Sequence, residues 1–561
     1  MTMDSQFRSE LSRRLFLSGM TGAGLIAPFS ALQAAQPRAT HDIPVLTGNT
    51  FDLVIGESLV NFNGSDRIAY TVNNSLPAPT LVWREGDTVT IRVRNTLSKM
   101  TAIHWHGIIL PFQMDGVPGI SFSGIAPGET FTYTFQVNQT GTYWYHSHAG
   151  FQEMRGLYGG IIILPRNGAF GKMREHLIHL SDWTDEDPVR LFARLKINSE
   201  FNNFNEPTVP DFISDIKRFG LDKALDVRKM WNQMRMSPVD LSDLSAYSMS
   251  YHLNGQRADQ NWTGLFKKGE EVLLRFINSS SNTFFDVRIP GLKMRIVEVD
   301  GLPVNPVSVD EFRFGSGETY AAIVTPVEDA HTIFAQTMDR SGHCRGTLAV
   351  RKGLEAPVPE RDAPEWLSMS DMGHGMSHDH GSHHEHQGPK VRHASSEYGP
   401  SVDMLVDNPK LRLDDPGVGL RNNGRKVLTL DDLHSVQYTP DKQDIHKEIE
   451  LHLTGNMERY SWSIDGLEFA KTTPVHFPHG KRLKVTLHND TMMTHPMHLH
   501  GMWSDVLNEA GQFQVRRHTF QVQPAQRMSF AVTADALGRW AWHCHLLFHM
   551  DAGMFREVIV A

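Results

Sequence analysis

Gly86-Asp-Thr-Val-Thr-Ile-Arg-Val-Arg-Asn95 carries an apolar residue at every second position between two turn residues. Strict alternation of this kind predicts a strand with one buried and one exposed face. The same pattern, with glycine and asparagine nine positions apart, returns in Gly269–Asn278 and in Gly480–Asn489. A unit that recurs three times in 561 residues predicts three copies of one strand-rich domain.

We therefore expect an all-β chain of three Greek-key β-sandwich domains, near residues 42–166, 172–352 and 425–561. Residues 353–424 break this pattern with a composition rich in histidine, methionine, glycine and serine. Because such a composition cannot bury a core, this segment is predicted to be a flexible linker. Helical periodicity is scarce, and we expect a helix or two only in residues 211–235.

The first 35 residues have the pattern of an export signal. A basic region with Ser12-Arg-Arg-Leu-Phe-Leu17 precedes a short apolar stretch and then small residues. The paired arginines resemble a twin-arginine signal, which implies export of the folded protein to the bacterial periplasm. No uncharged apolar run of 18 residues follows, so no transmembrane segment is predicted in the mature chain.

Composition excludes some functions and favours metal binding. The net charge of −9 argues against nucleic acid as a partner. Two cysteines allow at most one disulfide, and Cys344 is predicted to be a free, buried thiol. The 30 histidines and 25 methionines point to metal instead.

Four His-x-His pairs occupy matching places in the first and third copies of the repeat. They are His104-Trp-His106, His146-Ser-His148, His498-Leu-His500 and His543-Cys-His545. Side chains two positions apart on a strand point the same way, so each pair presents two imidazoles to one side. Eight converging imidazoles suit a cluster of about three copper, iron or similar ions. Structural zinc fits poorly because it prefers closed sites of four ligands.

Cys544 lies between two of these histidines, so in an extended strand it points away from both of them. His549 and Met554 follow it, and His495 precedes the third pair. Two histidines, one cysteine and a weak axial methionine make a blue-copper electron-transfer site. An electron that arrives at Cys544 then has a short covalent path to the histidines on either side.

These motifs resemble the four copper motifs of the multicopper oxidases, in order and over nearly the whole mature chain. The resemblance implies cupredoxin-like domains and four copper ions, with dioxygen reduced to water by four electrons that enter singly at the type 1 copper. The implied ligands are His495, Cys544, His549 and Met554 for type 1; His104 and His498 for type 2; His106, His146 and His545 for one type 3 ion and His148, His500 and His543 for the other.

Within the family, the export signal and the methionines most resemble the periplasmic copper-resistance oxidases of the CopA and PcoA type. Thioethers select Cu(I). Residues 369–386 of the linker carry three methionines and six histidines and are expected to hold further copper weakly, unless this is an ordinary solvated linker. The methionines of residues 369–386 are Met369, Met372 and Met376. A second group, which packing explains equally well, is Met230, Met234, Met236 and Met249.

Two carboxylic acids are candidates for proton supply to dioxygen. Phe548, directly before the last type 1 histidine, cannot exchange a proton. Asp115 follows the first motif and matches a family aspartate near the trinuclear cluster. Glu153, five residues after His148, is the second candidate by spacing alone.

Three functions remain open at this point. The first is a periplasmic oxidase that converts Cu(I) to Cu(II), with dioxygen as acceptor and periplasmic copper carriers as partners. The second is a laccase-type oxidase of small phenols, which would use the same copper core. The third is a copper-storage or scaffold protein of cupredoxin domains.

Overall fold

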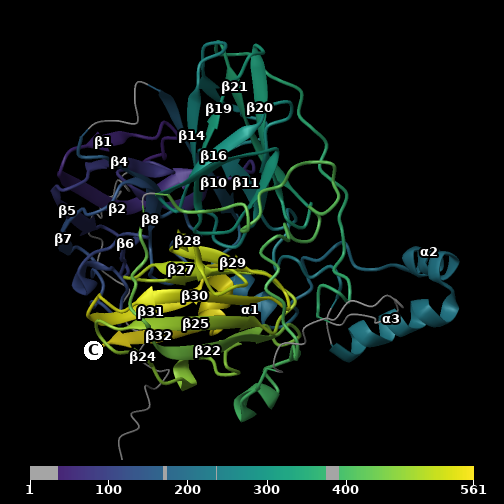
Figure 1. The fold of residues 1–561 in the computed structure, drawn as a ribbon. Coiled ribbons are helices and arrows are strands. Elements are labelled where there is room, and N and C mark those ends of the chain that lie inside the picture. The colour runs from purple at the N-terminus through teal and green to yellow at the C-terminus, as the bar shows by residue number, and fades with distance from the viewer. Residues whose placement is uncertain (1–35, 168–172, 235–236, 374–390, 437) are drawn as a thin grey trace, which may run out of the picture. The chain divides into compact units, whose positions relative to one another are not determined.

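The computed structural model describes residues 36–167, 173–234, 237–373, 391–436 and 438–561. The predicted export signal, Met236, Met376 and the six histidines between residues 374 and 386 lie outside the described residues. Residues Pro37–Ala561 form one compact unit, which holds every strand and helix described below. Its strands form six sheets, two for each copy of the repeat, and Figure 1 shows how they are arranged.

The first sandwich consists of a four-stranded and a five-stranded sheet. In sheet order, the strands are β3 (Arg67–Val72), β2 (Thr50–Val60), β5 (Thr88–Asn95) and β7 (Thr130–Gln136), then β1 (Val45–Thr47), β4 (Ala78–Arg84), β9 (Tyr158–Leu164), β8 (Gly141–His146) and β6 (His104–His106). The predicted alternation is confirmed in β5, where Val89, Ile91 and Val93 are buried.

The second sandwich has sheets of seven and five strands. These are β12 (Gln256–Arg257), β11 (Ser250–Leu253), β10 (Arg174–Trp183), β14 (Val272–Asn278), β19 (Thr319–Val324), β16 (Met294–Val299) and β17 (Leu302–Val309), then β13 (Trp262–Leu265), β21 (His343–Ala349), β20 (Ala330–Thr337), β15 (Phe285–Arg288) and β18 (Glu311–Phe314). Cys344, in β21, is free and buried, as predicted.

The third sandwich has sheets of six and five strands. These are β23 (Ser461–Ile464), β22 (Ile445–Asn456), β25 (Arg482–Asn489), β30 (Arg527–Thr533), β27 (Ser504–Leu507) and β28 (Phe513–Arg517), then β24 (Val475–Phe477), β32 (Phe555–Val560), β31 (Gly538–Cys544), β26 (His495–Leu499) and β29 (Thr519–Val522).

The three repeated segments are equivalent strands. Each of β5, β14 and β25 pairs in parallel with an earlier strand of its sheet and antiparallel with a later one. The exposed face predicted for β14 is wrong, because every residue of this strand is buried. Arg275 explains the difference, since it lies on β14 and donates a hydrogen bond to the Thr142 hydroxyl of the first sandwich over 2.8 Å. The second sandwich therefore packs the face of β14 that carries Arg275 against the first sandwich.

Helices are few, as predicted. They are α1 (Pro188–Leu195), α2 (Val209–Phe219), α3 (Leu221–Met234) and α4 (Leu547–Ala552), with short 3-10 turns η1 (Phe112–Met114), η2 (Ser395–Tyr398) and η3 (Phe469–Lys471). The helices expected in residues 211–235 are α2 and α3, which Figure 1 shows at the margin of the sheets. Among the described residues, the helices include none with both the length and the apolar character needed to span a bilayer.

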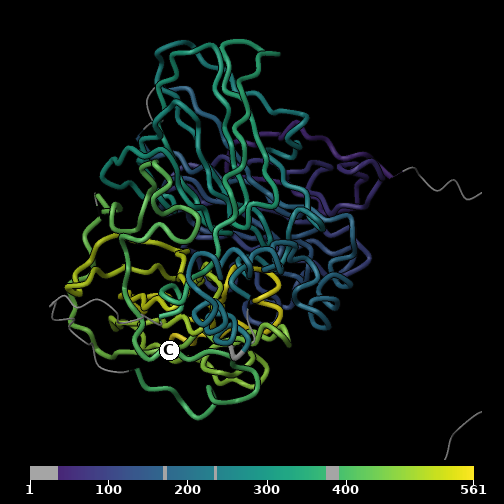
Figure 2. The backbone as a smooth tube through the Cα atoms, turned by 90° about the vertical axis from the view of Figure 1, so that its right-hand side faces the viewer, coloured from purple at the N-terminus to yellow at the C-terminus, as the bar shows by residue number. Residues whose placement is uncertain are grey.

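The flanks of the predicted linker differ from expectation. Residues 353–373 and 391–424 contain no strand, yet they bury Met369, Met372 and Val406 in the main core. The backbone amide of Lys410 donates to the carbonyl of Ala525, and Figure 2 shows this green segment beside the yellow strands of the third sandwich. The prediction that such a composition buries no core is therefore wrong for Met369 and Met372. The domain boundaries themselves stay a prediction.

Candidate metal centre

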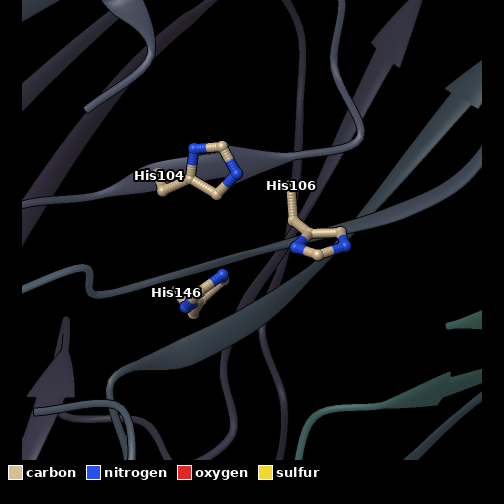
Figure 3. Close-up of side chains that lie close together, drawn as sticks. All are labelled: His104, His106 and His146. Atoms are coloured by element: carbon tan, nitrogen blue, oxygen red, sulfur yellow. The ribbon is translucent and has the colours of Figure 1, made fainter. Parts of the chain in front are cut away.

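Two strand pairs, one from the first sandwich and one from the third, hold the four His-x-His motifs. β6 pairs with β8 so that His104 lies opposite His146. β26 pairs with β31 so that His498 lies opposite His543. Repetition of one local arrangement in two sandwiches thus supplies histidines to a common space. Figure 3 shows the rings of His104, His106 and His146 around that space.

The eight rings of these motifs approach one another closely. The Nε2 atom of His543 lies 3.3 Å from Nε2 of His148 and 3.1 Å from Nε2 of His500. On the other side of the group, Nε2 of His545 lies 3.2 Å from Nδ1 of His106. The donor atoms of His104, His106 and His146 also fall within 4.8 Å of one another, as do those of His104, His498 and His500. These separations suit several metal ions that share one cavity.

Hydrogen bonds fix the tautomer and direction of the rings. His104 donates through Nδ1 to the carbonyl of Asp115 over 2.7 Å, and His498 donates through Nδ1 to the carbonyl of His518 over 2.8 Å. With Nδ1 protonated, the lone pair of each ring is on Nε2. In the described part of the chain, Nε2 of His104, His146 and His498 has no hydrogen-bond partner, although all three are buried. Buried, unpartnered nitrogens of this kind fit metal ligation.

Burial also lowers the pKa of most of the eight rings. It lowers the pKa of the His543 ring to about 4, with a small opposing effect from the Cys544 carbonyl. Burial, followed by repulsion between neighbouring imidazoles, lowers the pKa of six further rings well below the usual value: those of His106, His146, His148, His498, His500 and His545. Neutral imidazole is the form that binds a metal.

Cys544 faces a second group of donors. Its Sγ lies 3.5 Å from Nδ1 of His495 and 3.8 Å from Nδ1 of His549, and these two nitrogens are 3.1 Å apart. The rings of His543 and His545 point to the other group of histidines. Burial raises the pKa of the Cys544 thiol, so a thiolate here needs a cation beside it. Met554 is buried next to this group, because its backbone amide donates to the carbonyl of His549.

Side chains on the outer side of the His495 and His549 rings hold these two rings in place. Nε2 of His549 donates to the Asp243 carboxylate over 2.8 Å, and Nε2 of His495 lies 2.7 Å from the Thr491 hydroxyl. The indole of Trp462 stacks on the ring of His549 with centroids 3.9 Å apart. Both Nδ1 lone pairs are thereby directed toward Cys544.

The two predicted carboxylic acids both touch the histidine cluster. Asp115 accepts a hydrogen bond from Nδ1 of His500 over 2.9 Å. Glu153 lies 2.6 Å from Nδ1 of His146, and burial, followed by the nearby Asp182 carboxylate, raises its pKa well above the usual value. In the described structure, one carboxylate oxygen of each is buried without a hydrogen-bond partner.

Three residues of this centre were not predicted from the sequence. His518 is buried with its donor atom within 4.8 Å of those of His106 and His498. The Thr519 hydroxyl lies 3.0 Å from Nε2 of His106 and 3.0 Å from Nδ1 of His518. Asp243 comes from the second sandwich, far along the chain from His549. None of them belongs to a His-x-His pattern, so only the fold identifies them.

Comparison with known proteins shows which family this chain is similar to. Family models described as multicopper oxidase match residues 55–168, 174–351 and 443–561. Copper resistance protein A of Escherichia coli is 50% identical over 98% of this chain and 99% of its own length. A copper resistance protein A homolog of Pseudomonas syringae pv. tomato is 49% identical over 98% of this chain and 99% of its own length.

Solved structures show the same fold at lower identity. Fet3p, a multicopper oxidase that functions in iron import, gives a TM-score of 0.65 at 18% identity, over 92% of this chain and 90% of its own. The laccase from Botrytis aclada gives a TM-score of 0.62 at 20% identity, over 92% of this chain and 88% of its own. Predominance of strands and these neighbours confirm the predicted fold class of cupredoxin-like sandwiches.

Proposed function

Because the chain belongs to the multicopper oxidase family, and is thus an oxidoreductase with copper as cofactor, we propose that it oxidises Cu(I) with dioxygen in the bacterial periplasm and serves copper resistance. Four Cu(I) ions each lose one electron, and one dioxygen molecule takes up four electrons and four protons to give two water molecules. The observation that carries the proposal is the opposite direction of the Cys544 side chain and the rings of His543 and His545.

The proposed ligand sets follow the ring nitrogens described above. His495, His549, Cys544 and Met554 would hold the type 1 copper, with both imidazoles offering Nδ1. Around the trinuclear cluster, His106 binds through Nδ1, because its Nε2 lies against the Thr519 hydroxyl. The other ligands bind through Nε2: His104 and His498 for type 2, and His146, His545, His148, His500 and His543 for the type 3 pair. Bound copper supplies the one-electron redox steps and the binding of dioxygen.

The protein's own part is to orient ligands, exclude water and move protons. Asp115 orients His500, and Glu153 orients His146. Each carboxylate keeps a buried oxygen free of hydrogen bonds beside the cluster. We assign proton transfer to these oxygens because they lie one imidazole away from the space between the histidines.

Two features favour Cu(I) over a phenol as the electron donor. His549 is 0% exposed, so a phenol ring cannot lie against it without displacement of the segment that carries Asp243. The Asp243 carboxylate on the outer nitrogen of His549 attracts a cation. The relatives of about 50% identity are named for copper resistance, which agrees with this choice.

The export route is part of the proposal. The twin-arginine-type sequence before residue 36 would deliver a folded chain to the periplasm, where Cu(I) oxidation limits copper entry into the cell. Cell fractionation with and without Arg13→Lys and Arg14→Lys tests this step. The variant should accumulate in the cytoplasm.

The main experiment loads the protein with copper anaerobically and then measures oxygen uptake with Cu(I) and with a phenol as donors, side by side. Faster uptake with Cu(I) is expected. Faster uptake with the phenol in the absence of added copper supports a laccase instead. A full copper complement with no oxygen uptake from either donor supports a storage protein. Cys544→Ser serves as the control that lacks the proposed electron entry.

A further inference from the structure

A second group of histidines and carboxylates lies in the third sandwich, outside the copper centre. His452 is on β22, and Asp490 follows the end of β25 directly. His393 and Glu397 come from residues 391–398, where Glu397 lies in η2. Three separate segments of the chain thus meet at one point.

The donor atoms of this group form a closed ring of contacts. Nδ1 of His452 lies 2.6 Å from Oδ2 of Asp490 and 3.5 Å from Oε2 of Glu397. Nδ1 of His393 lies 2.8 Å from the same Glu397 oxygen and 3.7 Å from the same Asp490 oxygen. Tetrahedral ligands at about 2.0 Å from a metal are about 3.3 Å apart, which lies inside this range.

All four side chains are shielded from water. The exposed fractions are 3% for His393, 2% for Glu397, 4% for His452 and 0% for Asp490. Among the residues that the structure describes, no lysine or arginine forms an ion pair with either carboxylate. Buried charges in proteins are normally paired or coordinate a metal, so these two carboxylates need a cation.

Protonation of the imidazoles alone is a poor way to neutralise the carboxylates. It would make both rings cationic, and in the described structure Nε2 of His393 is buried without a hydrogen-bond partner, while Nε2 of His452 has only the Glu450 carboxylate at 3.8 Å, beyond hydrogen-bond distance. An unsatisfied charged N–H costs more free energy than an unsatisfied neutral one. A divalent cation neutralises both carboxylates and leaves both imidazoles neutral.

We infer that His393, Glu397, His452 and Asp490 bind one divalent transition-metal ion, in a site separate from the copper centre of the proposed function. Two imidazoles and two carboxylates suit Zn²⁺ and Cu²⁺, and Cu²⁺ binds such donors more tightly. The bound ion ties residues 391–398 to β22 and β25. The inference does not depend on the oxidase proposal, because it rests on different residues.

Zinc is the probe of choice, since it can be counted separately from the copper of the loaded protein. Full-length, copper-loaded protein is dialysed against Zn²⁺, and zinc and copper per chain are measured by mass spectrometry. The wild type should hold one zinc more than the double variant His393→Gln, His452→Gln, with equal copper and equal blue absorption. The control His331→Gln removes another buried histidine and should keep the zinc. Equal zinc in all three proteins overturns the inference.

Two further measurements cover the case in which the double variant does not fold. Glu397→Gln alone retains a hydrogen-bonding side chain, and its zinc affinity should fall at least about tenfold, as loss of a ligand requires. Crystals of the wild type soaked in Zn²⁺ should show an anomalous peak among the four side chains, and its absence overturns the inference. Titration of Cu²⁺ into the zinc-loaded protein then identifies the preferred ion, because a Cu²⁺ site releases the zinc.

Discussion

Cys544 is the residue at which the two proposed metal sites meet. Its sulfur faces Nδ1 of His495, while Nε2 of the adjacent His543 faces the ring of His500. Such a division follows from strand geometry, because successive side chains leave β31 on opposite faces. A single substitution is therefore expected to remove one proposed metal site and spare the other.

We expect Cys544→Ser to abolish the absorption near 600 nm that a copper–thiolate site produces. The histidine cluster should still bind its copper, because no ring of that cluster is altered. Absorption spectroscopy and metal analysis of the loaded variant measure both effects. A variant that keeps the blue colour would falsify the assignment of Cys544 as a copper ligand.

Asp115 offers a second test at a single residue. In Asp115→Asn the amide oxygen can still accept the hydrogen bond from His500, but the side chain no longer exchanges a proton. Oxygen turnover should fall roughly 100-fold, the lower end for loss of a general acid, with the blue band unchanged. Glu129→Gln, an exposed carboxyl group of the same sandwich, is the control and should keep full turnover. Unchanged turnover in Asp115→Asn removes Asp115 from proton transfer.

At the scale of elements, the turn after η1 positions Asp115. Gly116 has φ +82°, and a Cβ atom there would lie 1.8 Å from the carbonyl oxygen of Ile103. Because that neighbour is a backbone atom, the backbone directly before β6 has to move for a side chain to fit at position 116. Gly119, close by in the chain, has φ +81° with open space around it.

These two glycines predict different costs. Gly119→Ala should lower the free energy of unfolding by about 1–2 kcal/mol, the cost of the left-handed conformation alone. Gly116→Ala should lower it by about 3 kcal/mol or more, because the backbone clash adds to that cost. Urea denaturation of both copper-loaded variants measures the difference. An equal loss of unfolding free energy in the two variants would show that the turn at Gly116 accommodates a Cβ atom without added cost.

The loop that carries Asp243 makes stability depend on pH. Asp240, in the same loop, is buried and accepts hydrogen bonds from the Ser237 amide and the Asn203 side chain. Burial raises the pKa of its carboxyl group from 3.8 to about 7. Between these values the folded state holds a proton that the unfolded state has lost, so stability falls as pH rises from about 4 to about 7.

We expect Asp240→Asn to reduce this decline by on the order of 3 kcal/mol, since the amide does not titrate. Unfolding by urea at pH 5 and pH 8 compares the variant with the wild type. Glu318, whose pKa burial also raises to about 7, contributes a decline of the same sign in both proteins. The prediction therefore concerns how much the free energy of unfolding changes between pH 5 and pH 8 in the variant compared with the wild type. Identical changes in the two proteins would contradict it.

The alternation of apolar and polar residues correctly predicted those strands in which the strand itself decides where each side chain points. β5 shows its predicted buried face, and β31 sends Cys544 and its neighbours to opposite sides. β14 was predicted less well, because its second face is covered by another sandwich. Met369 and Met372 were misread for a similar reason, since burial of a segment depends on what packs over it. Asp243 and His518 lie outside any motif and enter the site only through tertiary packing.

On the scale of the whole molecule, buried polar contacts join the sandwiches. Arg517, at the end of β28, donates to Asp300 over 2.7 Å and to Glu318 over 2.8 Å, both in the second sandwich. The histidine cluster joins the first and third sandwiches in the same way, through rings from β6 and β26. Copper bound there would act as a cross-link between distant parts of the fold.

Removal of copper should therefore destabilise the whole unit. Copper held at about 1,000 times its dissociation constant contributes about 4 kcal/mol per site to the folded state. Scanning calorimetry should show a lower Tm after chelation and recovery when copper is restored, whereas Mg²⁺ should not restore it. An unchanged Tm in the apo protein would mean that the cavity is rigid without its metal.

The hydrogen bond between Asp115 and His500 spans 385 positions of the chain. At a ribosomal rate of about 5–20 residues per second, roughly 20–80 s separate the synthesis of its two ends. For most of its synthesis, the nascent chain therefore carries only the histidines that the first sandwich contributes to the cluster. Metal can be captured as a complete cluster only after His545, the last of the proposed cluster ligands in the sequence, has been synthesised and the chain has closed on itself, so loading has to follow synthesis of the third sandwich.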